Sequence, residues 1–173
     1  KLRRKPYSQL IFMKNHGIVI GANNLNEINI ILNELLEKTS SIQVVKDDAK
    51  SPVGDKIFKQ FGYIPSQDGG VNQLAINADL LSFLKTRWAL YPDHLVFLGR
   101  KPAILEKKII LADLIKHYER PIYIFVPGVG VYEHQNATIA HRVQIRCYFD
   151  ILSRQNRAQK LSVLTKYQID QVL

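Results

Sequence analysis

The chain has 173 residues, of which 46% are hydrophobic and 23% charged, which is the balance of a folded globular protein and not of a disordered one. This length suits one ordinary domain, which can bury a sizeable core without disulfide or metal staples. No apolar run approaches the roughly 18 residues that a membrane span requires, so we expect none. The net charge of +9 favours solubility or a small phosphorylated anion, because the cations are scattered and no nucleic-acid-binding motif accompanies them.

The chain has one cysteine, Cys147, so an intrachain disulfide and a Cys-rich zinc module are both excluded. No signal-peptide apolar segment follows the basic residues 1–5. Both features are typical of a protein of the reducing cytoplasm, and we expect that location.

The first predicted elements are two buried strands and an amphipathic helix. Short apolar runs at 10–13 and 18–20 flank a turn at 15–17, and runs of this length are typical of buried strands. Asn24 and Glu27 then have the spacing of a helix N-cap and its capping-box partner. Leucine and isoleucine recur at helical spacing beyond them, which predicts a helix.

Residues 46–76 are rich in glycine, proline and aspartate and predict an irregular linker, with a short helix at 56–61. It separates a first portion, 1–45, from a C-terminal portion, 77–173, in which strands and helices alternate. This alternation indicates an α/β fold. The predicted elements of the C-terminal portion are strands at 95–98, 103–105 and 121–126, and helices at 77–87, 109–118, 136–155 and after Thr165. Asn77 and Thr165 are the expected N-caps of the first and last of these helices, and His117 stands near the end of the 109–118 helix.

Histidines are the first candidates for a site. His16 stands between Asn15 and Gly17 where two predicted strands meet, which offers a rigid imidazole to a metal. An incidental histidine in a hairpin turn explains the same pattern, and spacing alone favours that explanation. His94 follows Asp93, and the two are either a carboxylate–imidazole pair near a substrate or metal, or ordinary turn residues.

Other chemical signatures are missing or weak. The chain has no P-loop, no G-x-S-x-G, no H-E-x-x-H and no C-x-x-C motif. The glycines at 128 and 130 suggest a dinucleotide turn, but Glu133 occupies the third glycine position, where a carboxylate would repel a pyrophosphate. Cys147 falls on the predicted inward face of the 136–155 helix and is expected to be an inert core thiol. The other residues predicted on that face are Ala140, Val143, Ile151 and Leu152.

Several segments together resemble a known family. Residues 10–21 (LIFMKNHGIVIG), with the capped helix after them, resemble the N-H-G segment of the class II aldolase/adducin family. Residues 91–99 (YPDHLVFLG), 126–132 (VPGVGVY) and 165–173 resemble its rhamnulose-phosphate-aldolase-like branch, in the expected order. The resemblance implies an incomplete α/β/α layered sheet of the class II aldolase type, followed by a smaller α/β portion.

The resemblance also implies a function. The chain would belong to a lyase that cleaves or forms a C–C bond in a small phosphorylated sugar and would assemble as a homo-oligomer. His16 would be one ligand of a divalent metal ion, with zinc the expected ion, and Asn15 and Gly17 would shape its turn. Asp93 and His94 would lie in a second shell or near the substrate, and no catalytic acid or base can be assigned.

One departure from the family divides the hypotheses. Family members carry an H-x-H pair and a proton-transferring carboxylate upstream of the N-H-G segment, and these 173 residues contain no H-x-H. One imidazole does not hold zinc tightly, since a catalytic site normally has three protein ligands. The chain is therefore either part of a metal-dependent aldolase or a noncatalytic adducin-like interaction domain. A nucleic-acid-binding domain, supported by charge alone, is a third and weaker hypothesis.

Overall fold

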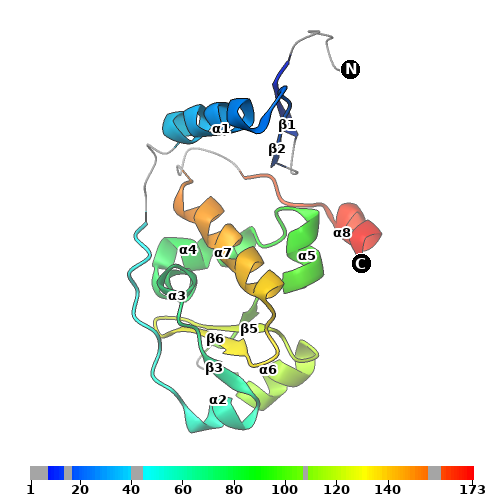
Figure 1. The fold of residues 1–173 in the computed structure, drawn as a ribbon. Helices are drawn as coiled ribbons and strands as arrows, with labels where there is room; N and C mark the ends of the chain where they lie inside the picture. Colours follow the sequence, from blue (N-terminus) through cyan, green and yellow to red (C-terminus); the bar gives the residue numbers. More distant parts are fainter. Residues whose placement is uncertain (1–7, 14–16, 40–44, 107–108, 156–160) are drawn as a thin grey trace. The chain divides into compact units, whose positions relative to one another are not determined.

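The structure is a computed structural model that describes residues 8–13, 17–39, 45–106, 109–155 and 161–173. The chain divides into two compact units, Lys1–Gln43 and Val44–Leu173 (Figure 1). Within the described residues it forms eight helices and two sheets, so the fold is mixed α/β. No helix in these described segments is long and apolar enough to cross a membrane.

The first unit consists of a β-hairpin followed by a helix. Strands β1 (Leu10–Met13) and β2 (Gly17–Ile20) pair antiparallel, with Met13 opposite Gly17. Helix α1 (Leu25–Thr39) follows, and the Glu27 amide donates to Oδ1 of Asn24 at 3.0 Å. The Glu27 carboxylate accepts from the Asn23 amide in return, at 3.1 Å. The predicted strands, helix and N-cap are therefore all present.

The burial of this unit differs from the prediction. Both strands were expected to be buried, yet most of their side chains are exposed, and Phe12 is 67% exposed. Helix α1 has no buried residue, and Leu25 is 77% exposed. The apolar pattern sets the local structure of these elements, but the described residues of this unit do not form a core of their own.

The second unit contains a four-stranded mixed sheet with the order β3-β6-β5-β4. Neighbouring strands are antiparallel except β4 and β5, which are parallel. Its strands are β3 (Tyr63–Pro65), β4 (Ala103–Ile104), β5 (Tyr123–Val126) and β6 (Gly130–His134).

Seven helices accompany this sheet in the described part of the second unit (Figure 1). They are α2 (Lys56–Gln60), α3 (Gly69–Ile76), α4 (Ala78–Thr86), α5 (Pro92–Leu98), α6 (Leu111–His117), α7 (Ile139–Ser153) and α8 (Lys166–Val172). Asn77 caps α4 and Thr165 caps α8, as their sequence positions predict. Both caps are local side-chain-to-backbone contacts, which explains why the sequence shows them.

Two segments differ from the sequence prediction. Residues 46–76, predicted to be an irregular linker with a short helix at 56–61, contain that helix as α2, but they also contain β3 and α3 and belong to the second unit. The apolar run 95–98, predicted to be a strand, lies in helix α5. Pro92 at the first turn and Gly99 at the C-cap, with φ of 81°, are the helix signals that decide this segment.

The main core lies where α3, α4 and α7 pack with β5 and β6. Asn72 of α3 is fully buried and joins two backbone segments through its amide. Its Nδ2 donates to the Ser66 carbonyl at 3.0 Å, and its Oδ1 accepts from the Val131 amide at 2.9 Å. Helix α3 thus contributes both apolar packing and a buried hydrogen-bonded link to β6.

Helix α7 presents a different face to the core from the one predicted. Of the five residues predicted to point inward, only Leu152 is buried, and Val143 and Cys147 are exposed. The buried residues of α7 are Ile145, Tyr148, Phe149, Leu152 and Ser153. The two aromatic rings bury more apolar area than valine or alanine would, and this favours the observed orientation.

Candidate functional site

The metal ligand expected from the sequence, His16, and its neighbour Asn15 lie outside the described residues. Gly17, the third residue of the motif, opens β2 with φ of 96°, a left-handed conformation that glycine adopts without strain. A Cβ at Gly17 would meet nothing within 4 Å, so the backbone conformation alone favours glycine here. The role of His16 therefore remains a prediction.

The second expected pair, Asp93 and His94, lies in the first turn of α5 and not at a strand entrance. Asp93 is exposed, whereas the side chain of His94 is fully buried. Successive residues of a helix project about 100° apart, which separates the two side chains. The structure therefore does not bring Asp93 and His94 together at an accessible site.

Aromatic rings surround His94. Its ring centroid lies 4.4 Å from that of Trp88, 4.8 Å from Tyr148 and 5.6 Å from Tyr91, each in an edge-to-face arrangement. Neither ring nitrogen of His94 has a hydrogen-bond partner among the described residues. Because burial disfavours the charged form, the pKa of His94 falls from 6.5 to about 3. This histidine is a neutral core residue, and solvent does not reach it.

The remaining histidines do not gather into a metal centre. His117 ends α6, as predicted, and His134 ends β6. His141 is the third residue of α7, where its Nδ1 lies 3.0 Å from the Thr138 amide in a capping box. The described segments hold no group of three or more His, Cys, Asp or Glu side chains placed to bind a metal. They do not form a complete metal site by themselves.

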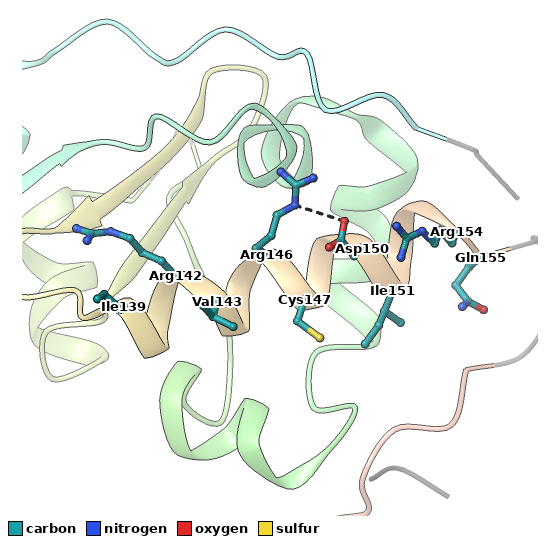
Figure 2. A pocket seen from close by; sticks show the side chains of 9 residues that line it. All are labelled: Ile139, Arg142, Val143, Arg146, Cys147, Asp150, Ile151, Arg154 and Gln155. Carbon is teal, nitrogen blue, oxygen red and sulfur yellow. Dashed lines mark hydrogen bonds and ion pairs between the residues drawn. The ribbon is translucent and has the colours of Figure 1, made fainter. Parts of the chain in front are cut away.

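A groove along the outer face of α7 is one of several concave surfaces on the second unit. Figure 2 shows its nine lining residues, all carried by α7 and the two residues that follow it. The groove has a volume of about 680 Å³. Its apolar stripe recurs every four residues, which places it on one side of the helix, and consists of Ile139, Val143, Cys147 and Ile151.

Arginines border this stripe, but the protein's own carboxylates neutralise two of them. Nε and Nη2 of Arg142 donate to Oε1 of Glu133, at 3.2 and 3.1 Å. Arg146 donates to Asp47 at 2.9 Å, to Asp68 at 3.1 Å and to Asp150 at 3.4 Å. The hydrogen bond from Arg146 lowers the pKa of Asp47.

These contacts limit what the groove can do. Arg142 and Arg146 already bind the carboxylates around them, so they position α7 and do not form a ready site for an anionic substrate. The exposed surface that remains is mainly apolar, with the thiol of Cys147 in its middle. Such a stripe is suited to packing against another apolar surface. The sequence showed the four-residue spacing, but the predicted inward orientation concealed that the stripe is exposed.

Comparisons of the chain with protein families, with curated proteins and with solved structures found no match.

Proposed function

We propose that the chain forms part of a metal-dependent class II aldolase-like protein that cleaves or forms a C–C bond in a sugar phosphate. In this proposal His16 is one ligand of a divalent ion, zinc being the expected ion. The carrying observation is the sequence of local structures around the N-H-G segment. Strand β1 precedes it, Gly17 follows His16 with φ of 96°, and β2 leads into the capped helix α1.

The exposure of the first unit supports this proposal. A two-stranded sheet is marginally stable alone, and a 15-residue helix gains most of its stability from packing of its apolar face. Here both elements expose apolar side chains such as Phe12 and Leu25. We therefore propose that β1 and β2 belong to a larger layered aldolase-like sheet whose other strands come from a further polypeptide segment or from a second subunit.

The described residues do not make a metal site, so the proposal requires ligands besides His16. We assign no catalytic step to this chain for that reason. A homo-oligomer in the cytoplasm is part of the proposal, supported by the exposed apolar surfaces and by the single cysteine.

The test measures bound zinc by mass spectrometry and sugar-phosphate cleavage. The samples are the 173-residue chain, the chain completed with an upstream class II aldolase half that contains H-x-H, and the completed protein carrying His16→Ala. We expect weak zinc binding and no turnover for the chain alone, stoichiometric zinc for the completed protein, and loss of both zinc and turnover in His16→Ala. His117→Ala, at an exposed position on α6, is the matched control and should keep both.

Two results would contradict the proposal. Zinc and turnover that survive His16→Ala in the completed protein would remove the role assigned to His16. Tight stoichiometric zinc on the 173-residue chain would show that its other side chains assemble a metal site.

A noncatalytic interaction domain is the second candidate, favoured by the exposed stripe of α7. Val143 in this stripe is 58% exposed and lies between two neutralised arginines. Val143→Glu should shift the sedimentation velocity profile towards a smaller species if the stripe mediates association. Val129→Glu, at a site 47% exposed between β5 and β6, is the control and should leave the profile unchanged. An identical profile for the native chain and Val143→Glu would count against this candidate.

A further inference from the structure

The contact between α5 and α7 contains a titratable group that neither candidate function uses. His94 is fully buried on α5, and its ring contacts Tyr148 of α7 and Trp88 of the segment before α5. Both nitrogens of its imidazole are buried without a hydrogen-bond partner among the described residues. The phenol of Tyr148 cannot supply one by donation, because it donates to the Arg87 carbonyl at 2.9 Å.

If His94 takes up a proton, no group in the aromatic cluster stabilises the resulting positive charge. A charged imidazolium needs water or a carboxylate, and its ring neighbours are aromatic. Titratable and charged groups on three helices and the segment before α5 surround the cluster. On and before α5 they are Asp93 and Tyr91, and on α7 they are Cys147, Tyr148 and His141, whose ring contacts Phe97 of α5. On α8 the group is Asp170, which binds Arg100. Of the two carboxylates, Asp93 is exposed to solvent, and Asp170 is paired with Arg100.

Helix α5 is short and has few buried residues, and its C-cap carbonyl accepts a hydrogen bond from Nε1 of Trp88 at 2.8 Å. It has seven residues, and only His94 and Leu95 are buried. Its N-cap, Tyr91, makes no side-chain capping bond, and its C-cap, Gly99, has φ of 81° with nothing within 4 Å of a Cβ. Leu95 packs with Ala89, Leu164 and α8 in a small cluster that is separate from the main core.

We propose that protonation of His94 releases α5 from α7, which makes α5 and the α8 helix packed on it an acid-sensitive element of the second unit. The released helix exposes His94 to water, which hydrates the imidazolium. Trp88 and Tyr148 belong to the main core as well as to the His94 cluster, but most residues of that core lie on α3, α4, α7, β5 and β6, so we expect it to stay closed.

The pH range follows from the two states of the histidine. In the closed state burial lowers the pKa of His94 to about 3, and in the open state it returns to the ordinary value of 6.5. The open state therefore binds more protons, and closure weakens as the pH falls below 6.5. The opening equilibrium approaches a tenfold rise per pH unit below 6.5 and increases by about 50-fold between pH 6.5 and 4.5. Asp47 and Glu106 act at lower pH: Arg146 and Lys85 lower their pKa values from 3.8 and 4.5, so the stability from these ion pairs is lost only below those ordinary values.

The test is hydrogen exchange of the 173-residue chain, followed by NMR between pH 7.5 and 4.5 and corrected for the intrinsic pH dependence of exchange. We expect the protection factors of the α5 and α8 amides to fall about 50-fold between pH 6.5 and 4.5, while those of β5 and β6 change little. Trp88 is the only tryptophan of the chain, and its emission should shift to the red over the same range.

Two variants identify the responsible imidazole. His94→Phe keeps an aromatic ring in the cluster without a titrating nitrogen, and His94→Leu serves if the phenylalanine is not accommodated. Either variant should make α5 protection independent of pH. His141→Gln is the matched control, because it removes the other imidazole that contacts α5 and keeps a residue suited to the capping box. It should retain the pH dependence.

Three outcomes would overturn the proposal. The first is α5 protection that does not change between pH 7.5 and 4.5. The second is a pH dependence that persists in both His94 variants or disappears in His141→Gln. The third is an equal loss of protection in β5 and β6, which would show ordinary acid unfolding of the whole unit.

Discussion

Helices α1 and α7 have the same length, 15 residues, and both begin with a side-chain cap, yet they are stabilised differently. Helix α7 buries five residues and packs with α5, α3 and α4, whereas α1 buries none. Both sequences repeat apolar residues at helical spacing. The comparison shows that periodicity and capping establish that a helix forms, while burial depends on whether the unit that contains the helix supplies a surface.

The largest effect should come from truncating a buried ring of α7. Phe149 is 2% exposed, so Phe149→Ala should lower the free energy of unfolding of the second unit by about 3–5 kcal/mol. Leu36→Ala on α1, where the side chain is 53% exposed, should change it by less than about 0.5 kcal/mol. Urea unfolding followed by Trp88 fluorescence measures both. Equal losses would contradict the difference between the helices.

The next largest effect concerns the buried side-chain amide of Asn72 on α3. Helix α1 has no buried residue and so no equivalent of this amide. Asn72→Ala removes the partners of the Ser66 carbonyl and the Val131 amide. Each of the two buried groups left unpaired costs about 1–3 kcal/mol, so we expect a total loss of about 2–6 kcal/mol by urea unfolding. A loss below about 1 kcal/mol would show that the two backbone groups find other partners.

A methyl group added where α3 meets α7 should have an intermediate effect. A Cβ at Gly70 would lie 2.6 Å from Cε1 of Phe149, so the ring must move. Overpacking costs about 1–3 kcal/mol and the helix gains up to about 1 kcal/mol from alanine, which leaves a net loss of about 1–2 kcal/mol. Gly54→Ala, with nothing within 4 Å, is the control and should be close to neutral in thermal unfolding. A stabilised Gly70→Ala would mean that the α3–α7 contact is loose.

The smallest expected effect is the loss of a cap. Thr138→Ala removes the N-cap of α7 and should lower the free energy of unfolding of the second unit by about 1 kcal/mol. Asn24→Ala removes the cap of α1 and should reduce the helical circular dichroism signal without changing the Trp88 transition. If Asn24→Ala destabilises the second unit as much as Thr138→Ala does, the two helices are energetically coupled.

Local features were the ones that the sequence predicted well. The caps at Asn24, Asn77 and Thr165 are present because each depends on residues within four positions along the chain. Strands β3 and β6 were not predicted, since their pairing joins segments about 70 residues apart and β6 begins in a glycine turn that reads as a loop. An apolar run of four residues does not distinguish strand from helix, which explains the error at α5.

The candidate sites divide in the same way. Spacing indicated the stripe on α7, but only the competition between that stripe and the larger rings of Tyr148 and Phe149 decides which face is buried. The burial of His94 depends on Trp88 and Tyr148, and Tyr148 is 54 positions away in the sequence. For His16 the sequence predicts a metal ligand, and the described residues do not test it.

The ion pairs of Arg146 also bear on how the second unit folds. Arg146 joins Asp47 and Asp68, which lie 99 and 78 positions earlier in the chain. The entropy of closing such long loops must be overcome before these contacts form, whereas helix caps form within a few residues. We therefore expect the Arg146 junction to assemble after the transition state for folding, where it slows unfolding and has little influence on the folding rate.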